Sequence, residues 1–305
     1  MRLKLGRPDL TRYAARFDVP RAASDFSVTF LGVSTLLFQD AESALVSDGF
    51  FSRPSLLRVG LGKIAPDLPR IDAALARAGV SQLDAVLPVH THFDHALDSA
   101  VVAERTGGVL VGGESAANVG RGHGLPASQV RVVGSGDSLT FGSFEVTWVV
   151  SDHCPPDRYP GTITEPVTPP TRAAAYRCGE AWSLIVGHTS GRTALVQGSA
   201  GFVPGALAGR RADVAYLGVG QLGVQDEDYI AAYWAETVQA VGARRVVLTH
   251  WDDFFRPLDQ PLRALPYAGD DLDVTMRALD RLAIRDGVTL HFPTVWQRED
   301  PWARG

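Results

Sequence analysis

Residues 87–98 read LPVHTHFDHALD, which places three of the chain's eight histidines and two aspartates within one short stretch. The apolar run LDAVLPV (83–89) that leads into the histidines predicts a buried strand. The segment ALDSAVVAERTGG (96–108) that follows them predicts a helix ending at a pair of glycines. The cluster therefore lies where a strand ends and a helix begins, a common place for the active sites of α/β proteins.

The residue types and their spacing in this cluster indicate metal binding. His90 and His92 point to the same side of an extended segment, because side chains alternate with a period of two. Asp94 precedes the helix and His95 lies in its first turn, so four side chains can converge above the strand end. Neutral imidazoles and a carboxylate are ligands that a Zn²⁺-type ion prefers. The alternative is a group of ordinary surface residues with Asp94 as an N-cap, which four such residues at this spacing disfavour.

Length and composition limit the classes of protein to which the chain can belong. The chain has 305 residues, of which 45% are apolar and 21% charged, and this suits one large α/β domain or two small ones with a sizeable core. The formal net charge is −5, with 29 basic and 34 acidic residues. There is no long basic run, so we expect a small-molecule substrate and no nucleic-acid partner.

No feature of the sequence predicts export or membrane insertion. Residues 1–20 carry charges but lack the apolar stretch of a signal peptide. No window of roughly 18 apolar residues predicts a membrane span. Cys154 and Cys178 are too few for a disulfide scaffold and lack Cys-x-x-Cys spacing. We therefore expect a cytoplasmic protein without a membrane span, and we make no prediction of its oligomeric state.

The order of apolar runs predicts two halves of similar architecture, each passing from β-hairpins into alternating helices and strands. Two sheets packed face to face with helices outside would bury these runs. Residues 1–24 look like a loosely structured lead-in, and the loop 155–170 holds six prolines, too many for regular structure. The predicted strands are 26–32, 34–40, 43–49, 83–89, 109–113, 144–150, 182–188, 193–198, 213–220, 243–250 and 288–292. The predicted helices are 70–79, 96–108, 226–242 and 270–287.

The stretch HTHFDH resembles the HxHxDH motif of the metallo-β-lactamase superfamily. The earlier segment FLGVSTLLFQDAESALVSDGF is similar to the opening hairpins of that family, whose last strand ends in an aspartate, here Asp48. The resemblance covers about residues 26–295. It implies an α/β (α+β) fold, a four-layer αββα sandwich, and we expect residues 1–305 to form a single domain of this kind. It also implies a metal site at one edge, between the two sheets.

The resemblance implies two groups of metal ligands, each completed by a histidine from later in the chain. His153 follows the predicted strand 144–150, and His250 ends the predicted strand 243–250, so each can complete one of the two groups. The implied ligands of one metal are His90, His92 and His153, and those of the other are Asp94, His95 and His250. We expect one or two zinc ions per chain, with manganese or iron as alternatives.

One position departs from the family pattern. Family members usually carry a metal-bridging aspartate where LVQGSAGF places Ser199, and a neutral hydroxyl bridges two dications poorly. Either one metal binds tightly and the other weakly, or both bind around a bridging hydroxide in a more cationic site. Asp48 or Asp252 is a candidate for a replacement carboxylate or for a contact that orients a histidine. The alternative role for Asp252 is a turn cap.

The predicted metal centre supports hydrolysis. A bound dication lowers the pKa of its water from 15.7 to about 7. Asp94 is the candidate catalytic residue, orienting that water and carrying its proton toward the leaving group. The bond attacked would be an ester, lactone, amide or phosphodiester, with an anionic substrate modestly favoured because one negative ligand is missing. A metal-dependent oxidoreductase and a non-catalytic binding protein with a degenerate site stay open as alternatives.

Several further residues have both a functional and an ordinary interpretation. The loop arginines could border the site or simply be solvated, and the aromatics after His250 could wall the pocket or pack in the core. GVGQLG (218–223) matches a dinucleotide-binding pattern, but the next strand ends in His250 where an acidic residue would be needed, so we interpret it as a tight turn near the metal edge. The arginines are Arg53, Arg158, Arg172 and Arg256, and the aromatics are Trp251, Phe254 and Phe255.

Overall fold

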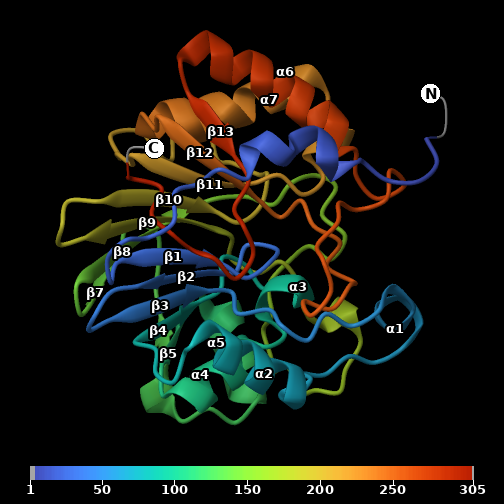
Figure 1. Cartoon of the computed structure of the whole chain (residues 1–305). Coiled ribbons are helices and arrows are strands. Elements are labelled where there is room, and N and C mark those ends of the chain that lie inside the picture. The colour runs from blue at the N-terminus through green and yellow to red at the C-terminus, as the bar shows by residue number, and fades with distance from the viewer. Residues whose placement is uncertain (1–3, 304–305) are drawn as a thin grey trace.

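The computed structural model describes residues 4–303, which form two seven-stranded sheets packed face to face (Figure 1). In order across the sheet, the first consists of β14 (Arg298–Glu299), β1 (Ser27–Phe30), β2 (Leu36–Gln39), β3 (Ala44–Ser47), β4 (Ala85–Leu87), β5 (Val109–Gly112) and β6 (Val130–Val132). The second consists of β13 (Thr289–His291), β12 (Arg245–Thr249), β11 (Val214–Gly218), β10 (Thr193–Gln197), β9 (Trp182–His188), β8 (Phe144–Val150) and β7 (Ser138–Phe141).

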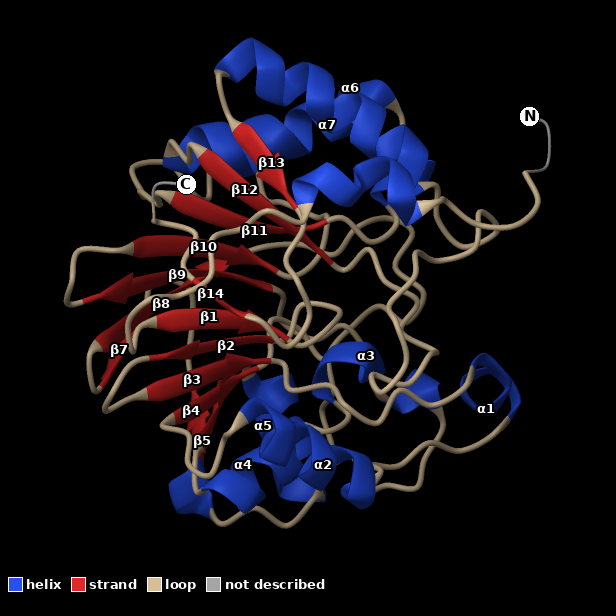
Figure 2. Cartoon of the chain, in the orientation of Figure 1, coloured by secondary structure: helices blue, strands red, loops and turns tan. Residues whose placement is uncertain are grey.

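Helices cover the outer face of each sheet, as Figure 2 shows, so the predicted αββα sandwich is confirmed. Beside the first sheet lie α2 (Leu68–Ala78), α4 (Ser99–Thr106) and α5 (Glu114–Gly122), and beside the second lie α6 (Glu227–Trp234) and α7 (Leu272–Asp286). The short helices are α1 (Leu56–Leu61), α3 (Phe93–Ala96), four 3-10 turns (Leu10–Arg16, Ala127–Gln129, Ala173–Ala175 and Leu222–Val224) and a π-helical turn (Ala235–Gln239). None of the helices within residues 4–303 is long and apolar enough to cross a bilayer.

The two inner sheet faces form one apolar core. Phe38 of β2 packs edge to face against Tyr216 of β11, with ring centroids 5.8 Å apart, and therefore joins the two sheets. Trp148 of β8 is fully buried in the same core. Truncating a buried aromatic of this kind costs about 3–5 kcal/mol of stability, so these contacts hold the sheets in the register that the site at their edge requires.

Strand direction places the candidate site residues at one edge of the sandwich. Each sheet begins as an antiparallel meander and continues as parallel strands, so β3 runs parallel to β4, and β10, β11 and β12 run parallel to one another. Asp48 follows β3, and Ser199 follows β10 by two residues. His250 directly follows β12. The carboxyl ends of parallel strands meet at one edge of a sheet, so segments far apart in the sequence contribute to one site.

Several segment boundaries differ from the sequence-based prediction. The predicted helix 96–108 begins later than expected, as α4 at Ser99, because a separate one-turn helix, α3, ends at Ala96 and a turn at Leu97 and Asp98 follows it. The buried Asp98 carboxylate in that turn accepts hydrogen bonds from the backbone N–H groups of Phe51 (2.7 Å) and Ser52 (2.6 Å). Helix α5 was not predicted, since its sequence ESAANVGRG contains two glycines, which are poor helix formers. The proline-rich loop 155–170 has no helix or strand, as predicted.

The predicted lead-in 1–24 is more ordered than expected where the structure describes it. A 3-10 helix spans Leu10–Arg16, and the Asp9 side chain caps its start by accepting from the Thr11 N–H (3.0 Å). Arg21 forms a β-bridge with Glu299. Residues 1–3, also part of that prediction, lie outside the described residues.

Candidate metal centre

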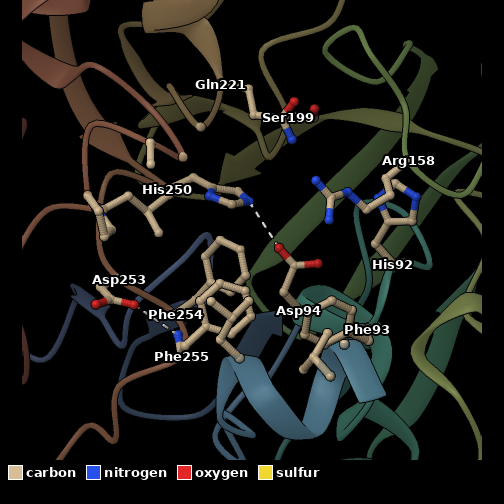
Figure 3. A pocket seen from close by; sticks show the side chains of 18 of the residues that line it. His92, Phe93, Asp94, Arg158, Ser199, Gln221, His250, Asp253, Phe254 and Phe255 are labelled. Atoms are coloured by element: carbon tan, nitrogen blue, oxygen red, sulfur yellow. Dashed lines mark hydrogen bonds and ion pairs between the residues drawn. The ribbon is translucent and has the colours of Figure 1, made fainter. Parts of the chain in front are cut away.

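The six side chains proposed as metal ligands converge at the edge between the sheets, in two groups. Within each group, one ligand-type atom from every member lies within 4.8 Å of the others. The first metal group is His90, His92 and His153, and the second metal group is Asp94, His95 and His250. Sequence reasoning divided the residues in the same way. Figure 3 shows Asp94, His92 and His250 facing one another across the pocket.

Local backbone features hold the two groups in place. His92 is the N-cap of α3, and Asp94 and His95 lie on that helix, which turns their side chains back toward the strand end. His250 adopts a left-handed conformation (φ 58°), and its N–H donates to the carbonyl of Val33 (2.6 Å). A Cβ at Gly220 would lie 2.6 Å from Nδ1 of His250, so only glycine leaves room for this ring. The predicted tight turn over 218–223 therefore packs directly on the site.

Each ring of the first metal group presents a lone pair to the centre. His153 donates from Nδ1 to the carbonyl of Cys154 (2.7 Å), which leaves Nε2 as the acceptor. Nε2 of His92 lies 3.1 Å from Asp157 Oδ1, so Nδ1 is the nitrogen left for the centre. His90 is 1% exposed, and its Nε2 has no hydrogen-bond partner among the described residues. A buried nitrogen without a partner is costly unless an ion or a water satisfies it.

Burial keeps these three rings neutral. It lowers the pKa of His90 well below its usual value, and the neighbouring rings of the site lower it further. Burial also lowers the pKa of His92, against the opposing effect of nearby carboxylates. For His153, burial and the His92 ring lower the pKa to about 4. Neutral imidazole is the form that binds metals, so the first metal group is ready for a cation at neutral pH.

The second metal group combines a carboxylate with two imidazoles. His95 Nδ1 lies 2.9 Å from Asp48 Oδ2, which orients Nε2 toward the centre. There it lies 3.2 Å from Nε2 of His250, while Asp94 Oδ2 lies 3.4 Å from the same His250 atom. Burial lowers the pKa of His95, but the Asp48 and Asp94 carboxylates outweigh it and raise that pKa above its usual value. Burial likewise opposes ionisation of Asp94, yet His95 and His250 hold its pKa below the usual range.

The donor set fits a divalent metal. Two ring nitrogens that face each other at 3.2 Å repel through their lone pairs unless a proton or a cation lies between them. His90 adds a buried nitrogen without a partner. Nitrogen ligands with one carboxylate suit zinc, manganese and iron, in keeping with the metals predicted.

The three candidates for bridging or supporting roles have different positions. Asp48 is fully buried and contacts His95, which corresponds to its predicted role of orienting a histidine. Asp252 contacts none of the site's imidazoles: it accepts from the Val33 N–H (2.8 Å) and binds Arg53 (2.5 Å), so it supports the turn behind His250. Ser199 lines the pocket, and its hydroxyl accepts from the Cys154 N–H (3.0 Å).

A cavity of about 640 Å³ opens over the metal centre. Of the arginines that sequence reasoning named, only Arg158 lines it; Arg53 is buried against Asp252. Phe254 and Phe255 form part of its wall, whereas Trp251 is 2% exposed and belongs to the core. The residues that line the cavity include Leu56, Val59, Phe93, Arg158, Ser199, Phe254, Phe255, Arg7, Asp253, Arg263 and Leu265.

Sequence reasoning missed two residues that shape the site. Asp157 lies in the proline-rich loop, where nothing in the pattern distinguished it from a solvated aspartate. Gly220 belonged to a motif recognised as a turn, but its contact with His250 depends on two strands that are separate in sequence. Cys154, beside His153, is buried, and burial raises its pKa to about 12, which suits a packed residue and not a reactive thiol.

Comparison with solved structures shows the same fold in bacterial proteins of low identity. A proposed metal-dependent hydrolase of Parabacteroides distasonis has a TM-score of 0.54 at 13% identity, covering 92% of this chain and 99% of that chain. A second proposed metal-dependent hydrolase, from Veillonella parvula, has a TM-score of 0.56 at 14% identity, covering 90% and 99%. CmlA, a diiron β-hydroxylase of Streptomyces venezuelae, has a TM-score of 0.55 at 14% identity, covering 91% of this chain and 54% of its own.

Sequence comparison decides the family. No curated protein matches the chain. The family model described as the beta-lactamase superfamily domain matches residues 60–251, which is more than half of the chain and includes HTHFDH. With the αββα fold and the two ligand groups at its edge, this match shows that the chain belongs to the metallo-β-lactamase superfamily.

Proposed function

We propose that the protein is a hydrolase that uses one or two divalent metal ions, zinc being the first choice, to cleave an ester, lactone, amide or phosphodiester bond. The observation that carries this proposal is the convergence of six ligand-type side chains, in two groups of three, four of which line one cavity. When bound, divalent metals supply a hydroxide nucleophile at neutral pH and polarise the oxygen of the bond under attack.

The chain's own residues divide the remaining work. Asp94 is ionised, 8% exposed and lines the cavity, so its carboxylate can accept a proton from a water beside it and pass that proton to the leaving group. Asp48 and Asp157 fix the orientation of the His95 and His92 rings. The apolar wall of the cavity limits water access, which strengthens electrostatic interactions within it.

Metal analysis combined with a substrate panel tests the proposal. Protein produced with zinc and without chelator should carry between one and two transition-metal ions per chain. His90→Ala and His92→Ala should each lower that content, whereas the control His291→Ala should not, because His291 binds Asp18 (2.6 Å) away from the site. A metal-free wild type would overturn the assignment of the site.

Inhibition separates metal-dependent hydrolysis from its alternatives. Activity on ester, lactone or phosphodiester substrates should disappear with a strong chelator, return with added metal and survive a serine-directed covalent inhibitor. Activity that survives the chelator but is lost with the serine-directed inhibitor would instead make Ser199 a nucleophile. Iron content with oxygen-dependent turnover would indicate the oxidoreductase alternative, and bound metal without turnover would indicate a binding protein.

A further inference from the structure

The cavity above the metal centre has a cationic side and an apolar side. Arg158 comes from the loop that follows His153, and Figure 3 shows its guanidinium pointing into the cavity near Asp94. Phe254 and Phe255 lie on the other side of Asp94, near His250. A substrate seated over the metals therefore meets a positive charge at one end and aromatic rings at the other.

The charge of Arg158 is available to a ligand, unlike that of the other arginines in the wall. Arg7 and Arg263 both bind Asp253 Oδ2, at 3.2 and 2.9 Å, so each already has a carboxylate partner, although this trio keeps one net positive charge. The Arg158 side chain is exposed and has no hydrogen bond or ion pair with any residue between 4 and 303. An anion entering the cavity thus meets in Arg158 a guanidinium that is not engaged with a protein partner.

Its neighbours hold Arg158 over the metal centre. Asp157 Oδ1 lies 3.1 Å from Nε2 of His92 and accepts from the Tyr159 N–H (2.9 Å). The Tyr159 carbonyl lies 3.4 Å from the same His92 nitrogen and accepts from the Cys178 N–H (2.9 Å). The backbone on both sides of Arg158 is therefore tied to the first metal group, which lowers the entropy lost when the guanidinium binds a ligand.

The opposite wall suits an apolar group. The Phe254 and Phe255 rings lie 4.4 Å apart, and Phe254 also packs against Phe93 (6.2 Å). Both rings are half-buried, so each keeps apolar surface that a ligand can cover. Covering such surface stabilises a complex by roughly 25 cal/mol per Å², without fixing one orientation of the bound group.

We propose that the substrate is an ester or amide whose acyl part bears a compact anionic group, a carboxylate or phosphate, bound by Arg158, and whose leaving group is apolar and lies on Phe254 and Phe255. This inference rests on the proposed hydrolase function. The water oxygen forms a bond to the carbonyl carbon, the bond from that carbon to the leaving oxygen or nitrogen breaks, and a proton from the water passes to the leaving atom. The products are an acid that keeps its original anionic group and gains a new carboxylate, whose proton is released to solvent, and an apolar alcohol or amine. Arg158 is the specificity-determining residue.

Two matched esters test this assignment in the zinc-loaded protein. 4-Nitrophenyl valerate and the mono-4-nitrophenyl ester of glutaric acid have acyl chains of equal length and differ in a terminal methyl group or carboxylate. The wild type should prefer the glutarate ester. Arg158→Gln should lose about ten- to hundredfold in kcat/KM for that ester, mostly through KM, and less than about twofold for the valerate ester. Arg172→Gln, an exposed loop arginine outside the cavity, is the control and should change neither. Equal losses on both esters, or no preference in the wild type, would overturn the inference.

A binding measurement separates failure of this inference from failure of the hydrolase proposal. Phenylphosphonate combines an anion with an aromatic ring and has no bond that the enzyme cleaves. Calorimetry on the metal-free protein should show binding that Arg158→Gln weakens about tenfold and Arg172→Gln leaves unchanged. If this holds and no ester is hydrolysed, the hydrolase proposal fails while the recognition stands. If esters are hydrolysed but phenylphosphonate binds wild type and Arg158→Gln equally, or binds neither, the role of Arg158 is refuted.

Discussion

The two metal groups differ in how the protein supports them. The first metal group is held partly by a loop: His153 donates to a backbone carbonyl, and His92 lies in ion-pair contact with Asp157 of the proline-rich segment. The second metal group rests on buried charge, because Asp48 orients His95, and the ion pair of Arg53 with Asp252 lies behind His250 with both side chains inaccessible to solvent. The residues that support the second group therefore also stabilise the fold, whereas the support of the first group depends on the conformation of one loop.

The largest effect that should expose this difference is on stability. Arg53→Leu leaves the buried Asp252 carboxylate without its partner, so we expect the free energy of unfolding of the metal-free protein to fall by about 3–5 kcal/mol. Arg263→Leu breaks a half-exposed pair with Asp253 at the cavity rim and should cost less than about 1 kcal/mol. Urea denaturation of the two variants measures both values, and similar losses would mean that the second group has no special support.

The next effect is on metal affinity. Asp48→Asn places an amide where His95 Nδ1 needs an acceptor, so the metal of the second group should bind about 10–100-fold more weakly. Asp40→Asn is a matched control, because Asp40 holds His188 in the same way (3.0 Å) on a distant hairpin. Competition with a chromophoric chelator gives both affinities. If the two variants lose affinity alike, the contact of Asp48 with His95 is not what orients the ligand.

Acid should release the two metals in sequence. Metal binding displaces a ligand's proton, so affinity falls as the pH drops below that ligand's pKa. Because the pKa of His95 is raised, this loss begins at a higher pH in the second group than in the first, at about tenfold per pH unit below that pKa. In the first group, whose His153 has a pKa of about 4, the corresponding loss should begin only near pH 4. Metal titrations between pH 5 and 8 check this order, and parallel loss at both sites would contradict it.

The smallest expected effect concerns the position between the groups. If Ser199 occupies the bridging position, Ser199→Asp adds a negative ligand shared by both metals, and the more weakly held metal should bind about tenfold more tightly, which is about 1.4 kcal/mol. The variant Ser199→Asn introduces a side chain of nearly the same shape as aspartate but without its charge, so it should not tighten binding of that metal. Ser199→Ala should barely change metal content. Equal second-metal affinity in wild type and Ser199→Asp would place the bridge elsewhere.

The fold and the composition of the candidate site were largely predictable, because both depend on local pattern. An apolar run followed by HTHFDH specifies a strand, a turn and a helix start within a few residues, and His153 and His250 each follow a recognisable strand. Strand alternation and helix periodicity likewise placed most of both sheets and the helices α2, α4, α6 and α7, but not β6, β7, β14 or α5. An element's end was misplaced where a distant contact decides it, as at Asp98, which binds the backbone of Phe51 between α3 and α4.

Apart from the contact of Asp48 with His95, the supporting contacts were not predictable, because they join segments distant in sequence. The partner of Asp252 is Arg53, almost two hundred positions earlier, and a single sequence does not reveal that pairing. The left-handed conformation of His250 depends on the Val33 carbonyl and on the missing side chain of Gly220. Sequence therefore indicates which side chains are suited to metal chemistry, and tertiary structure indicates what holds them.

The tie between His92 and the loop that carries Arg158 has a thermodynamic consequence. Asp157 and Tyr159 contact one nitrogen of His92, while its other nitrogen faces the first metal group, so the metal and an anion at Arg158 act on the two sides of a single ring. Their binding free energies are then linked, and linkage is reciprocal. The factor by which bound zinc raises the affinity for the anion equals the factor by which the bound anion raises the affinity for zinc. Where substrate is plentiful, the protein would retain its metal at lower free zinc concentrations than in its absence.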